Sequence, residues 1–179
     1  MLYNMNMCKL YTPFAHAKSV YEIDVEFFQK IGAQTLLIDL DNTLDSYRTK
    51  EPSQRAFDLK DKIESQGLEM IIVSNNRGKR VSHYAEKLGA RFISSAGKPF
   101  ARKLKRRMKE LGIDPGRTVM IGDQTVTDVA AGNRCKIRTI LTDKIVKEDQ
   151  PTTHFNRLFD RPIRRYLKRH HKLVDWRNR

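Results

Sequence analysis

The fold of this chain is decided by one stretch, Leu36-Leu37-Ile38-Asp39-Leu40-Asp41-Asn42-Thr43-Leu44. An apolar run, typical of a buried strand, ends in two aspartates that lie two residues apart. Side chains at positions i and i+2 of a strand point to the same side, so Asp39 and Asp41 can meet above the strand end. That end is where an open α/β sheet binds ligands. The pattern predicts a carboxylate site, with an acidic turn after a buried strand as the alternative.

Two neighbouring carboxylates restrict the chemistry that this stretch can support. They repel each other, and a bound divalent cation such as Mg²⁺ relieves the repulsion. One aspartate can then attack phosphorus while the other moves a proton and the cation screens charge. The stretch therefore favours phosphoryl transfer.

Apolar strand patterns alternate with helical patterns along the rest of the chain. We expect strands at residues 35–39, 69–74, 91–93, 118–122 and 138–141. Helices are expected at residues 24–30, 52–66, 78–88 and 100–111, and another is expected to begin at residue 124. This alternation predicts an α/β fold, a three-layer sandwich with a mainly parallel sheet of about five strands.

Three further signals stand at predicted strand ends or turns. Ser74 and Asn75 stand at the end of the second strand, where a hydroxyl and backbone N–H groups can hold phosphate oxygens. Lys98 precedes a proline, and a lysine near phosphate acts as a point charge. Asp123 follows the fourth strand and Asp128 lies five residues on, so the first can coordinate Mg²⁺ and the second can orient it. Taken singly, each is also typical of a turn or a helix cap.

In their order, these residues resemble the motif set of the haloacid dehalogenase (HAD) superfamily: Asp-x-Asp-x-Thr, then Ser, then Lys, then Gly-Asp-x-x-x-x-Asp. The match covers residues 36–128 without a missing element. Within the superfamily, residues 11–13, 39–44, 74–76 and 121–124 resemble the YqeG-type phosphatases of HAD subclass IIIA. Those are small bacterial proteins related to the mitochondrial phosphatidylglycerophosphate phosphatase.

The resemblance implies a catalytic role for several motif residues. Asp39 would be the nucleophile that forms an aspartyl-phosphate, and Asp41 would be the general acid and base. Ser74 and Lys98 would hold the transferring phosphoryl group. The remaining residues implied on the substrate side are Thr43, which would also brace the loop, and Asn75.

The resemblance also implies a Mg²⁺ site. Asp39, Asp41 through its backbone carbonyl, and Asp123 would bind the ion. Asp128 would lie behind them in the second layer of contacts. The carboxylate of Asp41 also separates this chain from dehalogenase-type members, which lack a second acid there.

The short connections leave no room for a cap domain over the site. Residues 45–51 and 75–97 are the two connections that could hold a cap, and both are far shorter than a domain. An open site admits a phosphate carried on a large object. We therefore expect a phosphomonoester on a lipid headgroup, with phosphatidylglycerophosphate favoured. The alternatives are a soluble small-metabolite phosphatase and a nucleic-acid- or ribosome-associated module with weak phosphatase activity.

The net charge of +14 is concentrated in two segments. Residues 98–109 hold seven basic residues and no acid, and residues 157–179 hold nine basic residues against two acids. Such segments favour an anionic membrane surface or nucleic acid as a partner. We expect Pro162 to open an amphipathic helix in the tail. Its basic side chains would then be candidate membrane contacts (Arg164, Arg165, Lys168 and Arg169), and packing of the apolar stripe on its own domain is the alternative.

Composition and length complete the expectations. We divide the chain into a hydrolase domain with an N-terminal extension, residues 1–150, and a basic helical tail, residues 151–179. Cys8 and Cys135 form no disulfide framework, and the first residues lack a signal-peptide pattern. These features favour a cytoplasmic protein, peripheral at the inner face of the membrane. Trp176 is expected either to anchor at that interface or to lie in a disordered tail.

Overall fold

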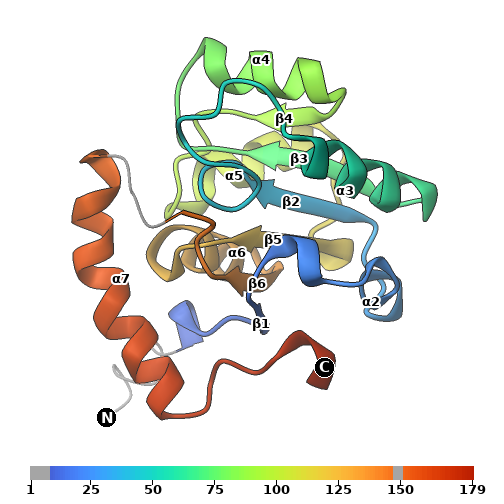
Figure 1. The fold of residues 1–179 in the computed structure, drawn as a ribbon. Coiled ribbons are helices and arrows are strands. Elements are labelled where there is room, and N and C mark those ends of the chain that lie inside the picture. The colour runs from blue at the N-terminus through green and yellow to red at the C-terminus, as the bar shows by residue number, and fades with distance from the viewer. Residues whose placement is uncertain (1–8, 147–150) are drawn as a thin grey trace.

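One parallel sheet organises the protein (Figure 1). The computed structural model describes residues 9–146 and 151–179, with side chains of the second range from residue 158 onward. Within these ranges the sheet has six strands in the order β1-β6-β5-β2-β3-β4, all paired in parallel. The strands are β1 (Ala15–Ala17), β2 (Thr35–Asp39), β3 (Glu69–Val73), β4 (Arg91–Ile93), β5 (Thr118–Gly122) and β6 (Arg138–Thr142).

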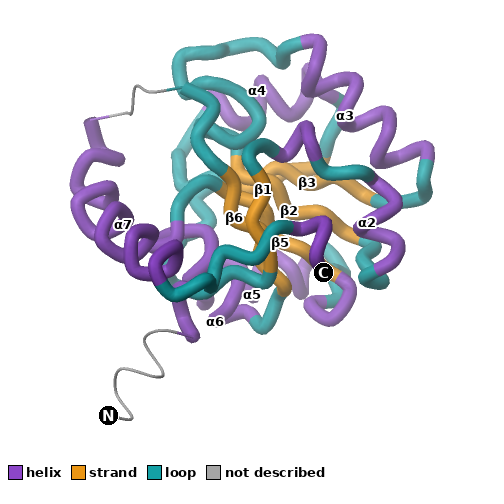
Figure 2. Tube along the Cα trace, turned by 60° about the horizontal axis from the view of Figure 1, so that its bottom comes forward, coloured by secondary structure: helices purple, strands orange, loops and turns teal. Residues whose placement is uncertain are grey.

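Helices cover both faces of the sheet, which makes three layers (Figures 1 and 2). The helices that pack into the core on one face are α2 (Val25–Lys30), α3 (Gln54–Ser65) and α4 (Lys79–Leu88). The opposite face carries α5 (Ala101–Glu110) and α6 (Ala130–Cys135). The predicted three-layer α/β fold is confirmed, and no cap domain is evident among the residues that the structure describes. The short edge strand β1 makes six strands where about five were expected.

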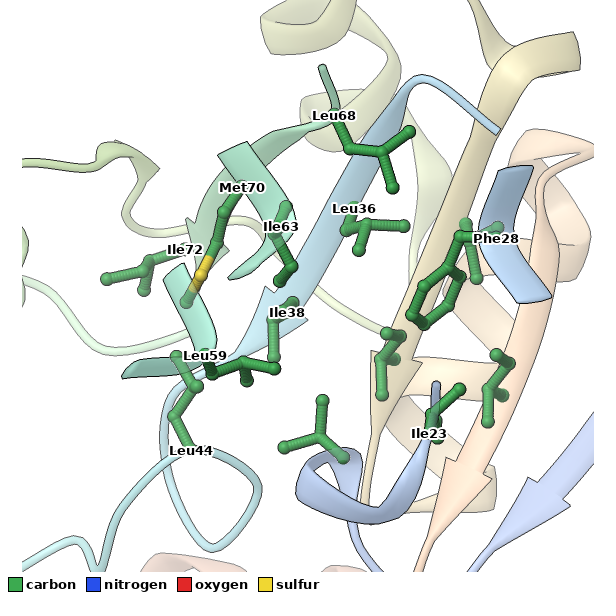
Figure 3. Packing of buried hydrophobic residues seen from close by; sticks show 14 of the residues in the cluster. Ile23, Phe28, Leu36, Ile38, Leu44, Leu59, Ile63, Leu68, Met70 and Ile72 are labelled. Atoms are coloured by element: carbon green, nitrogen blue, oxygen red, sulfur yellow. The ribbon is translucent and has the colours of Figure 1, made fainter. Parts of the chain in front are cut away.

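Strand β2 shows why its sequence is a continuous apolar run. Leu36 and Ile38 pack toward α2, α3 and α4, where Phe28 and Ile63 meet them (Figure 3). Leu37 points to the other face and packs in the cluster under α5 and α6. A strand covered on both faces needs apolar side chains at every position, as parallel sheets generally do.

The chain changes direction across the sheet between β2 and β5. After β2 it continues to β3 on one side, and after β5 it continues to β6 on the other. The loops at the carboxyl ends of these two strands therefore lead away in opposite directions, and the point between them is the usual ligand position in such sheets. The register pairs Ile38 with Ile121, so Asp39 comes level with Gly122, directly before Asp123.

The C-terminal helix begins earlier than predicted. Helix α7 (Pro151–Arg169) contains Pro162 in its interior, so the prediction that Pro162 opens the helix is wrong. Pro151 takes the first position, where a missing N–H costs nothing. Pro162 and Leu158 are both exposed, so water can reach the carbonyl that Pro162 leaves without its helical N–H.

Trp176 is neither an interfacial anchor nor part of a disordered tail, and both of those predictions are wrong. Its side chain is 5% exposed and packs edge-to-face on Phe27, with ring centroids 5.4 Å apart. The preceding segment lies beside β1, where the His16 N–H donates to the carbonyl of Val174 at 2.8 Å. An indole delivered to the core by this pairing buries a large apolar area.

Three sequence expectations concern regions at the limits of the described residues. Cys8, most of the N-terminal extension and the predicted domain boundary at residue 150 lie outside them. Within the described ranges, no helix combines the length and the apolar character needed to cross a bilayer.

Candidate active site

Three aspartates come together at the carboxyl ends of β2 and β5. Carboxylate oxygens of Asp39, Asp123 and Asp128 lie within 4.8 Å of one another, and all three side chains are buried. Asp39 ends β2, Asp123 follows β5, and Asp128 lies in the π-helix Thr125–Val129. Lys98 reaches the same place from the loop after β4 and donates to Asp39 at 2.5 Å and to Asp128 at 2.6 Å. Residues far apart in sequence therefore converge here, whereas Asp41, which its spacing predicted to meet Asp39, is not part of the cluster.

Gly122 makes room for this cluster. A Cβ atom at this position would stand 2.4 Å from Cγ of Asp128, a distance that real contacts do not show. The Asp128 carboxylate occupies that space and accepts the backbone N–H of Gln124 at 3.1 Å. The glycine before Asp123 is therefore required by the close approach of Asp128 rather than by a turn.

The charges of the cluster do not balance among these side chains. Burial raises the pKa of Asp39 well above its usual range; Lys98 opposes this rise, while Asp128, Asp123 and Asp41 add to it. Burial alone would lower the pKa of Lys98, but Asp128 and Asp39 outweigh it and hold that pKa above its ordinary value. Lys98 is thus a cation bonded to Asp39 and Asp128, with Asp123 as the third carboxyl group of the cluster. The cluster therefore has more carboxylate oxygens than Lys98 can bind, and these oxygens are suitable ligands for a divalent cation.

Asp41 lies outside the three-carboxylate cluster. Its carboxylate accepts from the side-chain amide of Asn76 at 2.7 Å and from the guanidinium of Arg80 on α4. Arg80 also donates to the carbonyl of Thr49 at 3.2 Å. Asp41 is one-fifth exposed, so these bonds fix its carboxylate at a position that solvent can partly reach. The binding of metal through its backbone carbonyl stays a prediction.

The residues after β3 support the Lys98 loop. Ser74 is buried, and its hydroxyl accepts the N–H of Asn76 at 3.1 Å. Both ends of the Asn75 amide bond the backbone of Lys98, the NH₂ group to its carbonyl and the oxygen to its N–H, each at 2.7 Å. The side chain of Asn75 thus holds Lys98 in place, and its predicted contact with substrate stays a prediction. The predicted contacts of Ser74 with a phosphoryl group stay predictions.

The loop after Asp41 closes on itself through backbone bonds. Asn42 adopts a left-handed conformation with φ of 64°, and its N–H donates to the carbonyl of Asp45 at 2.7 Å. Thr43 is buried, and its hydroxyl has no hydrogen-bond partner among the described residues. Asp45 is buried, and its carboxylate accepts from the Ser53 N–H at 3.0 Å and the Tyr84 hydroxyl at 2.6 Å.

Tyr84→Phe tests the contribution of this buried carboxylate to stability. The variant keeps the ring in the core but removes the hydroxyl donor to Asp45. Because a buried carboxylate loses one partner, we expect the free energy of unfolding to fall by about 1–3 kcal/mol. Urea denaturation measures the change, with Tyr166→Phe on an exposed side chain as the control. Equal stability of the two variants would contradict the assigned role of the Tyr84 hydroxyl.

One arginine predicted to contact a membrane is turned inward. Arg164 donates through Nη2 to the backbone carbonyls of Asp123 and Thr142, at 2.5 and 2.7 Å. Its Nε donates to Asp160 on the same helix at 3.0 Å. The prediction that Arg164 belongs to an outward basic face is therefore wrong. Leu167 is buried as well, so α7 packs on its own domain.

Four side chains near the site were not predicted from sequence: Asn76, Arg80, Asp160 and Arg164. All of them contact residues at least 35 positions away, and no local pattern marks such contacts. A signal for the last pair was nevertheless present. Asp160 is the only acid in residues 151–174, and it stands one helical turn before Arg164.

Sequence comparisons agree with the class that this site suggests. A family described as HAD-hydrolase-like matches residues 95–158. The chain is 33% identical over 161 residues to a Bacillus subtilis protein named "Probable phosphatase YqeG", covering 90% of this chain and 94% of that protein. It is also 25% identical to phosphatidylglycerophosphate phosphatase 1 of Arabidopsis thaliana. That match covers 91% of this chain but only 50% of the Arabidopsis protein.

A comparison with solved structures shows that the fold is also similar to that of a known phosphatase. The cobalt-bound deoxy-D-mannose-octulosonate 8-phosphate phosphatase of Haemophilus influenzae superposes with a TM-score of 0.51 at 15% identity, over 64% of this chain and 80% of that one. With these likenesses and the motif order, the chain is a HAD phosphatase. Within that class it belongs to the YqeG phosphatase family.

Proposed function

We propose that this chain is a Mg²⁺-dependent phosphomonoesterase in which Asp39 forms an aspartyl-phosphate. The observation that carries the proposal is the buried cluster of Asp39, Asp123 and Asp128 around Lys98 at the end of β2. The atoms that this cluster offers to a metal ion are carboxylate oxygens, which are the ligands that Mg²⁺ prefers. Asp39 and Asp123, with the backbone carbonyl of Asp41, would hold the ion, and Asp128 would orient the site through Lys98 and the Gln124 N–H.

The proposed reaction assigns a role to each of these side chains. Asp39 attacks phosphorus, a bond forms between its carboxylate oxygen and phosphorus, and the bond to the leaving alcohol oxygen breaks. Asp41 protonates that oxygen and then takes a proton from the water that attacks the aspartyl-phosphate, which releases inorganic phosphate and restores both aspartates. Lys98 and Ser74 hold the phosphoryl oxygens throughout. Bound Mg²⁺ offsets the charge that gathers on these oxygens.

We propose a phosphomonoester on a lipid headgroup, phosphatidylglycerophosphate, as the substrate. The relative from Arabidopsis thaliana that carries this activity in its name supports the choice, as does the absence of an evident cap domain. Phe100 also supports it: this side chain is 71% exposed, two residues after Lys98, and is followed by the exposed bases Arg102 and Lys103. An apolar side chain among cations suits an anionic lipid surface. The protein would then act in the cytoplasm, peripheral at the inner face of the membrane.

Phosphate release from phosphatidylglycerophosphate in anionic vesicles tests the substrate. Glucose 6-phosphate, a nucleoside monophosphate and a 5′-phosphorylated RNA are assayed beside it with Mg²⁺, and Asp39→Asn is the control. We expect the highest kcat/KM on the lipid and no turnover by the variant. Faster release from a soluble ester or from RNA would overturn the lipid assignment while keeping the phosphatase chemistry.

A further inference from the structure

Helix α7 reaches the predicted metal loop through two side chains one turn apart. The helix stands on the side of the sheet toward which the carboxyl ends of the strands point (Figure 1). Asp160 is 1% exposed, and it accepts from Nε of Arg164 at 3.0 Å. A carboxylate buried to this degree needs several donors to offset the loss of hydration. Two further donors to Asp160 come from the loop that carries the predicted metal ligands.

The first contact lies at the start of the π-helix. Oδ1 of Asp160 accepts the backbone N–H of Thr125 at 2.6 Å and the Thr125 hydroxyl at 2.5 Å. Thr125 begins the helical turn that contains Asp128. Because the backbone between them is helical and buried, fixing Thr125 also fixes the position from which the Asp128 side chain projects.

The second contact lies at Asp123 itself. The Arg164 guanidinium donates to the carbonyl of Asp123, to the carbonyl of Thr142 and, through Nη1, to Asp143 at 3.1 Å. These acceptors lie at the carboxyl ends of β5 and β6, so one planar group connects two adjacent strand ends. A guanidinium suits this role because its donors are fixed in one plane.

We propose that Asp160 and Arg164 are positioning residues of the metal site. They hold Asp123 and Asp128 at the spacing that a cation needs, against the mutual repulsion of the three buried carboxylates. Partners behind a metal ligand typically set metal affinity in this way. The inference rests on the proposed function, because it takes the carboxylate cluster to bind Mg²⁺. It also gives the basic C-terminal segment a role inside its own domain.

Arg164→Gln tests the proposal, with Arg161→Gln as the matched control. Arg161 is exposed on the same helix, and its substitution removes the same charge. Mg²⁺ binding to each protein is measured by calorimetry and by the rise in Tm that Mg²⁺ causes. We expect the Kd of Arg164→Gln for Mg²⁺ to rise by about 10- to 100-fold, with kcat largely restored at saturating Mg²⁺. Arg161→Gln is expected to bind Mg²⁺ as the wild type does.

Two milder variants keep the test decisive if Arg164→Gln does not fold. Arg164→Lys retains the charge but loses the planar donor set, and Asp160→Asn retains an acceptor for Thr125 but loses the charge facing Arg164. Both are expected to raise the Kd for Mg²⁺. A folded variant with a lowered metal-free Tm but wild-type affinity would show that the pair only stabilises the fold, which overturns the proposal. Wild-type protein that binds no divalent cation would overturn the proposed function first, and this inference with it.

Discussion

Asp39→Asn is expected to lower the rate of phosphate release by about 10⁴- to 10⁶-fold, the range seen when a catalytic nucleophile is removed. An amide oxygen is too weak a nucleophile to attack phosphorus, and the amide carries no charge for a cation. The side chain is buried and fixed by Lys98, so Asn occupies the same space without disturbing the sheet. Initial rates with saturating Mg²⁺ measure the loss. Asp61→Asn on the exposed face of α3 serves as the control.

Although Asp39→Asn is expected to lose activity, we expect it to be more stable than the wild type at neutral pH when no metal is bound. Because burial raises the native pKa of Asp39 above its unfolded value, ionisation of this carboxyl costs native stability. The protonated Asp39 carboxyl therefore favours the native state. This contribution to stability is present in full below the pKa of Asp39 in the unfolded chain, and it is lost as the pH rises through the pKa of Asp39 in the native protein. Asn cannot ionise, so the metal-free variant should lose less stability than the wild type between acid and neutral pH. A variant that is inactive because it has unfolded would contradict this account.

Lys98→Met is expected to give the largest loss of stability of any single change at the site. Methionine fills the volume of the side chain but leaves Asp39 and Asp128 without the cation that faces both. Removing one partner from a buried ion pair typically lowers the free energy of unfolding by about 3–5 kcal/mol. Added Mg²⁺ should return more stability to this variant than to the wild type, because it supplies positive charge to the same carboxylates.

Urea denaturation with a chelator, and again with Mg²⁺, checks both parts of that expectation. Lys109→Met, on the exposed side of α5, is the control and should change stability by no more than about 0.5 kcal/mol. If Lys98→Met proved as stable as the control without metal, the charge balance assigned to the cluster would be wrong.

Much of this fold follows from local pattern. The continuous apolar run of β2 needs no partner to be recognised, and Pro and Gly mark several helix ends along the chain. The convergence of Asp39, Lys98 and Asp123 also follows, because parallel strands bring their carboxyl ends to one edge. Strand β1 was not predicted from the sequence because Ala15–Ala17 is short and its burial depends on pairing with β6, which is distant in sequence.

The unpredicted features share a physical cause. Nine basic residues lie within residues 157–179, and the one local feature that sets Arg164 apart is Asp160 one helical turn before it. That feature does not indicate which way the arginine points. Its inward position is set by carbonyls at the ends of β5 and β6. Trp176 is likewise placed by Phe27 on α2, almost 150 residues earlier. Interactions of this range become visible only once the chain is folded.

The most direct test of the central claim is to trap the phosphorylated enzyme. The protein is mixed with phosphomonoester and Mg²⁺, quenched in acid during turnover and digested, and the peptides are weighed by mass spectrometry. The account predicts one phosphoryl group on the peptide that contains Asp39, removed by hydroxylamine and missing from Asp39→Asn. Steady turnover with no phosphoryl group on this peptide, or with one on another residue, would contradict it.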